Sequence, residues 1–201
     1  MKRLVFLLLT MCSFTLSQAQ WWADPYLTEE EKRVDDKTKD EAYLAPTSKL
    51  VGKKWYLRDG YYYIFNANGT GEQVEIKYDT YDGKKYYITE NQPITWKRNK
   101  SVLNITFLSK QLTIKPVTSS ISKFSLRVQD EIKRHWARQQ NEKRNKYMNS
   151  SYECEIDKLT NNIMYLTWIS VDNTGKREYD RRGYLSKKRF DEINVKESVK
   201  E

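Results

Sequence analysis

Residues 50–107 read LVGKKWYLRDGYYYIFNANGTGEQVEIKYDTYDGKKYYITENQPITWKRNKSVLNITF, a run of short segments rich in aromatic and β-branched residues. Such segments are typical of β-strands. Asn68-Gly69 and Asp82-Gly83 favour tight type I′ turns, Pro93 interrupts a later segment, and Asn99-Lys100 breaks the chain again. Closely spaced strands of this kind indicate an antiparallel meander, with strands expected at 53–58, 61–67, 71–78, 84–89, 94–97 and 102–107.

The ladder continues through further segments later in the chain. Strands are expected at 111–117, 150–159, 163–171 and 176–186, with turns at Asn161-Asn162 and Asn173-Thr174-Gly175. In the segment 163–171, Met164, Leu166 and Trp168 share one face while the other face is also partly apolar. Because a meander must hide its edges, the sequence predicts a mainly β fold, an antiparallel barrel of about eight strands over residues 50–190.

Several short motifs resemble the lipocalin-like domains of secreted and periplasmic proteins from Bacteroidetes. They are Leu50-Val51-Gly52 with Trp55, the run YIFNANGTG at 63–71, Ile94-Thr95-Trp96 before Leu103-Asn104-Ile105, and YECEIDKLT at 152–160. The resemblance covers roughly half of the chain beyond residue 20. It implies a lipocalin-like barrel, and it implies the fold better than the function, because such families share an architecture more than an activity.

Residues 1–20 have the composition of a secretory signal peptide. A basic start at Lys2-Arg3 precedes an apolar core and the small-residue end Ser17-Gln18-Ala19, so we expect cleavage after Ala19 or Gln20 and an exported protein, periplasmic or secreted. The alternative is a lipoprotein anchored through Cys12. Removing Lys2 and Arg3 leaves 34 basic against 27 acidic residues, a net charge of +7. No later apolar run is long enough for a transmembrane helix.

Cys154 is then the single cysteine, and it alternates with Tyr152 and Ile156 in an expected strand. This pattern favours a small buried side chain over a reactive thiol.

Residues 21–49 are expected to form an N-terminal helical segment. The aromatic residues Trp21, Trp22 and Tyr26 are interpreted as packing on the barrel rim, with a partner contact as the alternative. Thr28 and Glu31 form a capping-box pattern that predicts a helix from Glu29 to about Tyr43. At the other end of the chain, residues 191–201 are expected to be a polar tail.

Residues 121–147 are predicted to form a long basic amphipathic helix inserted in the barrel. Phe124, Val128, Ile132 and Trp136 recur every four residues and define one apolar stripe. Three interpretations compete for this helix: a strut packed by its stripe, a contact surface for an anionic envelope component, and a nucleic-acid surface, which export disfavours. The acidic N-terminal helix could also lie against it. The anionic-surface candidates are Arg127, Lys133, Arg134, Arg138 and Lys143.

Catalytic motifs are nearly absent from the sequence. His135 is the single histidine, no nucleophile-elbow or phosphate-binding glycine pattern is found, and we expect neither a metal nor another cofactor. A pair of carboxylates brought together in space would leave glycosidase-like chemistry open.

The remaining distinctive feature is 15 Tyr, 6 Trp and 6 Phe. Aromatic residues fill the interior of small barrels, and they also form the walls of ligand pockets. The leading functional hypothesis is therefore a non-enzymatic binding protein that holds a small apolar or amphiphilic ligand in the barrel. The alternative is an envelope interaction or assembly protein that uses the basic helix or the aromatic N-terminus as a contact surface. The oligomeric state is left open. The candidate ligand-binding residues of the interior are Trp55, Tyr61, Tyr63, Phe65, Trp96 and Trp168.

Overall fold

The computed structural model describes residues 27–57, 61–172 and 174–198. The expected signal peptide 1–20, Cys12 and the aromatic segment 21–26 lie outside these residues. In chain order the elements are α2 (Glu29–Lys32), α3 (Asp36–Leu44), η1 (Thr47–Lys49), β1 (Lys54–Tyr56), β2 (Tyr61–Phe65), β3 (Thr70–Tyr81), β4 (Lys84–Asn99), β5 (Val102–Phe107), η2 (Ser109–Gln111), β6 (Thr113–Pro116), α4 (Thr118–Ile121), α5 (Leu126–Lys146), β7 (Ser150–Leu159), β8 (Ile163–Val171), β9 (Arg177–Ser186) and α6 (Lys187–Ser198).

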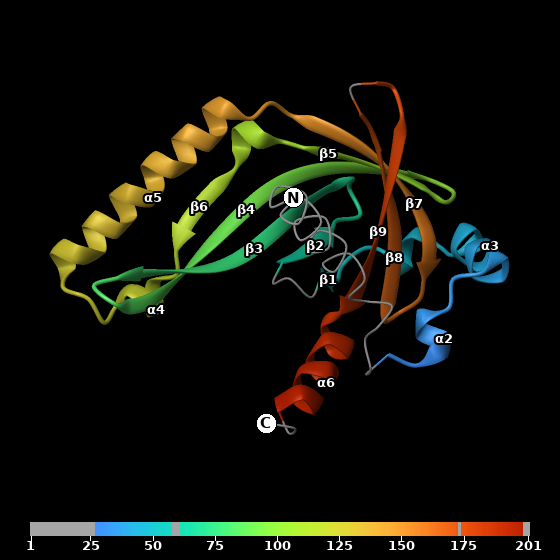
Figure 1. Ribbon diagram of the computed structural model, residues 1–201, viewed down its shortest axis with the longest axis horizontal. Coiled ribbons are helices and arrows are strands. Elements are labelled where there is room, and N and C mark those ends of the chain that lie inside the picture. Colours follow the sequence, from blue (N-terminus) through green and yellow to red (C-terminus); the bar gives the residue numbers. More distant parts are fainter. Residues whose placement is uncertain (1–26, 58–60, 173, 199–201) are drawn as a thin grey trace, which may run out of the picture.

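An eight-stranded antiparallel barrel forms the centre of the molecule (Figure 1). Its strands follow the order β3-β2-β1-β9-β8-β7-β5-β4, and the pairing of β3 with β4 closes the ring. The mainly β, barrel-type fold class is thus confirmed. The expected strand at 111–117 shortens to β6, which pairs with β4 outside the ring.

The β3–β4 hairpin extends beyond the barrel and, together with β6, forms what we call the arm (Figure 1). β4 is a single strand of 16 residues, so the two separate strands predicted at 84–89 and 94–97 are wrong. Pro93 is tolerated because it falls between Asn91, the last residue paired with β6, and Ile94, the first paired with β5. At this junction its missing N–H costs no ladder hydrogen bond.

α5 covers the arm with its apolar stripe. Ile132 is buried, while Val128 and Trp136 are half-buried against the cluster that includes Tyr86 and Ile88. The Trp136 indole Nε1 donates to the Tyr86 hydroxyl at 3.0 Å. The structure thus gives the helix the packing expected of a strut, but its support is the arm rather than the barrel wall.

The helix predicted over 121–147 is present as α5, but it begins at Leu126 and ends at Lys146, and α4 is a separate helix before it. α4 ends at Ile121, and α5 begins after Ser125, whose hydroxyl accepts from the Val128 N–H at 3.4 Å. A cap at Ser125 therefore replaces the expected start at residue 121.

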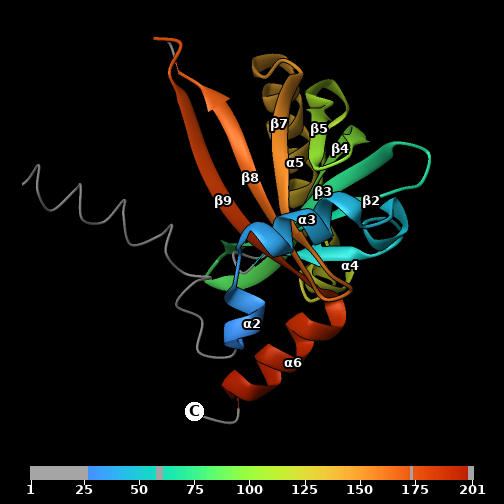
Figure 2. The same ribbon diagram turned by 90° about the vertical axis from the view of Figure 1, so that its right-hand side faces the viewer.

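The end of the barrel away from the arm is sealed by side chains of the N-terminal segment. Ala42 and Ala45 at the end of α3, followed by Leu50, join the main core beside Trp55 and Phe65. Figures 1 and 2 place α2, α3 and α6 on one side of the barrel and α5 on the other. The acidic helices consequently do not lie against the basic helix.

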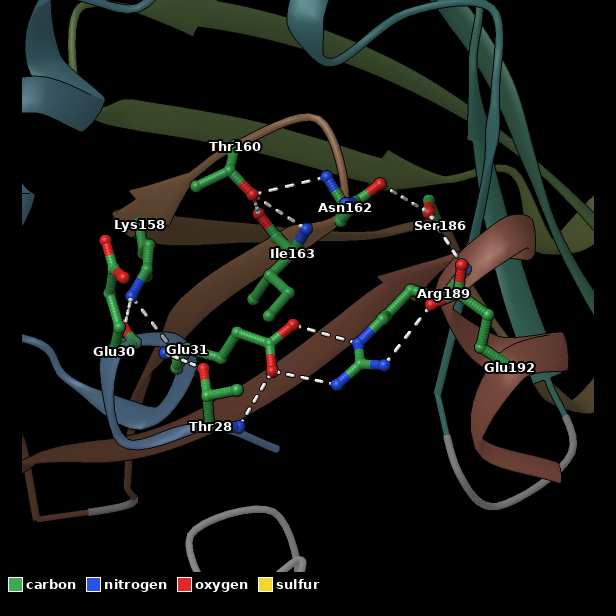
Figure 3. A network of polar contacts seen from close by, with 10 residues as sticks. All are labelled: Thr28, Glu30, Glu31, Lys158, Thr160, Asn162, Ile163, Ser186, Arg189 and Glu192. Carbon is green, nitrogen blue, oxygen red and sulfur yellow. Dashed lines mark hydrogen bonds and ion pairs between the residues drawn. The ribbon is translucent and has the colours of Figure 1, made fainter. Parts of the chain in front are cut away.

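A polar network ties α2 to the barrel and to α6 (Figure 3). The buried Lys158 ammonium donates to the backbone carbonyls of Glu30, Glu31 and Arg33. The lysine thereby caps the C-terminal end of α2. Arg189 binds the Glu31 carboxylate through two nitrogens, Nε and Nη2, at 2.8 and 2.9 Å. This bidentate pair joins the two ends of the described chain.

The expected polar tail at 191–201 is helical over residues 191–198, because residues 187–198 form α6. Phe190 and Ile193 lie three residues apart on one face, and they pack with Leu27, Ile163 and Leu185 on the outer surface of β8 and β9.

The predicted N-terminal helix is likewise divided. The capping box of Thr28 and Glu31 is present, but α2 ends at Lys32. Asp35 then caps α3, and in return the Asp35 N–H donates to the Thr38 hydroxyl at 2.8 Å. A second capping box thus interrupts the helix that the sequence predicted as continuous.

The Asn68-Gly69 turn sits at a hairpin tip as expected, but it is not type I′. Gly69 has φ +79° whereas Asn68 is not left-handed, and the Gly69 N–H donates to the Asn66 carbonyl at 3.1 Å. This is the three-residue loop with a left-handed glycine. At Asp82-Gly83 both residues have positive φ, which agrees with the type I′ expectation.

Gly69→Val should lower the free energy of unfolding by about 1–3 kcal/mol, because a β-branched residue resists positive φ. An added Cβ would also approach the Trp96 carbonyl oxygen at 3.2 Å. Urea denaturation of wild type, Gly69→Val and Gly69→Asn measures the effect. Asn tolerates the left-handed region and should lose less, so equal stability of the two variants would contradict the argument.

Candidate functional site

A cavity of about 710 Å³ opens at the arm end of the barrel, between the barrel interior and the C-terminal end of α5. Its walls combine aromatic side chains with charged and amide groups. The barrel strands supply Tyr63, Gln73, Glu75, Glu90, Gln92, Phe107, Ser150, Tyr152, Trp168, Ser170, Asp180 and Arg182, and the remaining lining comes from Ser109, Leu112, Lys143, Tyr147 and Met148.

One face of β4 positions the polar part of this cavity. Alternate side chains along a strand share a face, so the face that buries Ile88 in the arm and Ile94 in the barrel core also presents Glu90 and Gln92 between them. The register places Gln73 of β3 opposite Gln92 and Glu75 opposite Glu90. The polar patch is therefore built by two paired strands at the point where the arm leaves the barrel.

Two lysines hold the two carboxylates together. Lys143 of α5 contacts both oxygens of Glu90, with Nζ–Oε distances of 2.7 and 2.8 Å. Lys77 bridges Glu75 and Glu90 at 2.8 and 3.2 Å. Burial alone would raise the pKa of Glu90, but the hydrogen bonds and charge of Lys143, assisted by Lys77, leave that pKa below its ordinary value. Glu90 is accordingly ionised at neutral pH.

The opposite wall is aromatic. Trp168 contacts the rings of Phe107, Tyr152 and Tyr63 at centroid distances of 6.3, 5.7 and 6.1 Å. Its indole N–H donates to the buried Tyr184 hydroxyl at 3.0 Å, which fixes the ring. Rings held in this way form a preformed apolar surface.

Arg182 lies beside this wall. Its guanidinium sits 5.5 Å from the Trp168 ring and pairs with Asp180 at 2.6 Å. It also donates to the Tyr61 hydroxyl at 3.2 Å.

All six predicted interior aromatics meet in or against the main core cluster. Of these, Tyr63 and Trp168 line the cavity. Trp55, Phe65 and Trp96 instead fill the closed half, where the indole N–H groups of Trp55 and Trp96 donate to the Leu50 and Thr70 carbonyls. Tyr61 is half-buried at the edge of the core and meets Arg182.

The five predicted anionic-surface residues divide into two groups. Arg127, Lys133, Arg134 and Arg138 are exposed on α5. Lys143 is half-buried, and the expectation that it projects away from the packed face is wrong, since it turns inward to Glu90. The carboxylate supplies the reason, because an inward lysine there gains two charge-assisted contacts.

The cavity residues that sequence reasoning missed are mainly Gln73, Glu75, Glu90, Gln92 and Asp180. A signal for two of them exists in the alternation of β4. Glu90 and Gln92 have the same parity as the apolar residues Ile88, Ile94 and Trp96, so they share the inward face.

Other candidate chemistry does not gather at one place. Cys154 is buried, and burial raises the pKa of its thiol to about 12, which agrees with the interpretation as a small core side chain. His135 is exposed beside Trp136. Among the described residues no group of three or more metal-ligating side chains occurs. In the same part of the chain, none of the helices has the length and apolar character needed to cross a membrane.

Comparison of the chain with protein-family models, with curated proteins and with solved structures found no match. The fold and the cavity therefore give the description of the protein: it is an eight-stranded barrel that is sealed at one end and has a mixed aromatic and polar cavity at the other.

Glu90→Gln should lower the free energy of unfolding at pH 7 by about 1.5–3 kcal/mol, because it removes a carboxylate that accepts charge-assisted hydrogen bonds. The lowered pKa of Glu90 means that this contribution is present above the ordinary pKa of 4.5 and disappears as the pH falls through the folded-state value. Urea denaturation at several pH values from 7 to 3 should show the two proteins converging in acid. Glu178→Gln, at an exposed position on β9, is the matched control and should change little. A difference between wild type and Glu90→Gln that persists undiminished at low pH would contradict the assignment.

Proposed function

We propose that the chain is an exported, non-enzymatic binding protein of the lipocalin-like kind, and that its arm-end cavity holds a small amphiphilic ligand. The carrying observation is the cavity itself, whose volume of about 710 Å³ lies within the range of small-molecule sites. Its fixed aromatic wall suits the apolar part of a ligand, and its carboxylates, amides and serines suit a polar part. A purely apolar ligand fits this lining less well, because it would cover the polar groups without pairing them.

Binding rather than catalysis is supported by the way the lining charges are engaged. Glu90 is held ionised by Lys143 and Lys77, and Asp180 is paired with Arg182. A general acid or base needs a pKa close to the working pH. The contacts with Lys143 and Lys77 instead lower the pKa of Glu90, away from neutral pH. Export is supported by the composition of residues 1–20, with the lipoprotein anchored through Cys12 as its alternative.

A cavity-filling substitution tests the binding proposal. Gln73→Trp should abolish most of the fluorescence enhancement of the neutral amphiphile N-phenyl-1-naphthylamine, because the indole would occupy the space that the probe needs. Ile76→Trp, on the exposed outer face of the same strand, adds the same side chain outside the cavity and should leave the enhancement unchanged. Near-UV circular dichroism verifies that both variants are folded. Equal enhancement in all three proteins would place the probe elsewhere and contradict the proposal. Native mass spectrometry of protein purified from its own source would then identify the natural ligand.

A second candidate function is contact with an anionic envelope component through α5. Arg127, Arg134 and Arg138 line one surface groove of this helix with Glu131, Ala137 and Asn141, so three bases face one acid, and the opposite face of the helix is already used for packing. An exposed basic face of this kind suits phosphate-rich lipid headgroups or lipopolysaccharide.

Reversing Arg134 and Arg138 to Glu should change stability little, because exposed charges contribute little. The same double variant should lose salt-sensitive co-sedimentation with vesicles containing an anionic phospholipid. Reversal of Lys84 and Lys85 to Glu, at the tip of the arm, controls for net charge. Binding that is equal before and after reversal, or absent in wild type, would leave α5 as a packing element.

A further inference from the structure

The charged groups of the cavity are already neutralised, either by one another or by the neighbouring Lys77. Glu75 pairs with Lys77 at 2.8 Å, Glu90 with Lys143 at 2.7 Å, and Asp180 with Arg182 at 2.6 Å. An anionic or cationic ligand group would have to separate one of these pairs to obtain a counter-ion. Because separation leaves a partly buried charge without its partner, the cavity disfavours a ligand of strong net charge.

The two amides of the cavity, in contrast, retain most of their hydrogen-bonding capacity. The Gln73 side chain forms no hydrogen bond with another residue of the described chain, and the one formed by the Gln92 side chain runs from Nε2 to the Pro93 carbonyl at 3.3 Å. An amide offers two donors and an acceptor. An alkyl chain lying on these side chains would cost about 1–3 kcal/mol for each group left without a partner.

A ligand for this cavity must therefore combine uncharged donors and acceptors with an apolar face. Hydroxyl groups meet the first requirement, since each donates and accepts, as the amides Gln73 and Gln92 do. The second is met by the C–H face of a pyranose ring, which can lie on the aromatic wall of Phe107, Tyr152 and Trp168.

We infer that the arm-end cavity binds a neutral, polyhydroxylated ring ligand, that is, an uncharged saccharide or the uncharged saccharide part of a glycoconjugate. This assignment rests on the proposed binding function and narrows its ligand class. Gln73 and Gln92 then hydrogen-bond the ring hydroxyls, while the paired carboxylates Glu75 and Glu90 accept from further hydroxyls without giving up their lysines.

Isothermal titration calorimetry with a defined panel tests the inference. The neutral probes are cellobiose, maltose, lactose and N,N′-diacetylchitobiose. Their charged counterparts are glucuronate and glucosamine, and laurate and decanol represent alkyl ligands. At least one neutral disaccharide should bind wild type with a dissociation constant in the millimolar range or tighter, and more tightly than the charged sugars.

Variants locate that binding in the cavity. The double variant Gln73→Leu/Gln92→Leu keeps the side-chain size but removes the amides, and it should weaken disaccharide binding at least about tenfold, the equivalent of one hydrogen bond. Gln92→Leu alone should give a smaller loss in the same direction, and it provides the measurement if the double variant does not fold. Gln111→Leu, exposed and outside the cavity lining, should bind as wild type does.

The outcomes distinguish failure of the saccharide assignment from failure of the proposed binding function. If laurate, decanol or N-phenyl-1-naphthylamine binds in a manner that Gln73→Trp abolishes while no saccharide binds, the ligand class is wrong and the binding function stands. If a disaccharide binds equally to wild type and the Gln→Leu variants, the assignment to this cavity is overturned. If neither saccharides nor amphiphiles bind, both the inference and the proposed function fall.

Discussion

The inward face of β4 is the constraint on which the rest of the structure depends. A strand alternates its side chains strictly, so the residues that enter the arm core, the cavity and the barrel core must follow one another at every second position. Ile88, Glu90, Gln92 and Ile94 fulfil this order. A shift of one residue in the pairing with β3 would turn all of them outward and destroy both apolar clusters together with the cavity.

The contact of Lys143 with Glu90 links α5, which covers the arm, to the cavity at the end of the barrel. Along α5 the apolar stripe ends at Trp136, and its continuation is polar: Gln140 accepts from the Ile114 N–H at 2.8 Å, and Lys143 reaches Glu90. The helix is thus apolar where it covers the arm core and polar where it borders the cavity. Its support and its contribution to the site come from one continuous face, which explains why a strut helix also carries a cavity residue.

Alternation and turn dipeptides were sufficient to predict the barrel, its hairpins and both faces of β8, because these depend on local pattern. The arm was not predicted, since a proline such as Pro93 normally marks the end of a strand. Pro93 is tolerated because it lies where the pairing partner of β4 changes from β6 to β5. α6 was missed because Phe190 and Ile193 are too few to mark a helix until the outer surface of β8 and β9 is known. The polar cavity was missed because charged strand residues usually face solvent. Glu90 was therefore not predicted to face inward, although it alternates with Ile88 and Ile94 on the same face of β4.

The sealed end and the open end of the barrel require different side chains for the same physical reason. Where α3 and η1 cover the strands, water is excluded, so Trp55 and Phe65 pack without space and the indole N–H groups find backbone carbonyls. At the other end, α5 is held away from the barrel because it rests on the arm, and the gap that remains admits solvent and tolerates ionised groups. The size of the cavity is consequently set by the geometry of the arm. Any ligand that contacts Glu90 or Gln92 therefore touches β4, the same strand against which α5 packs in the arm.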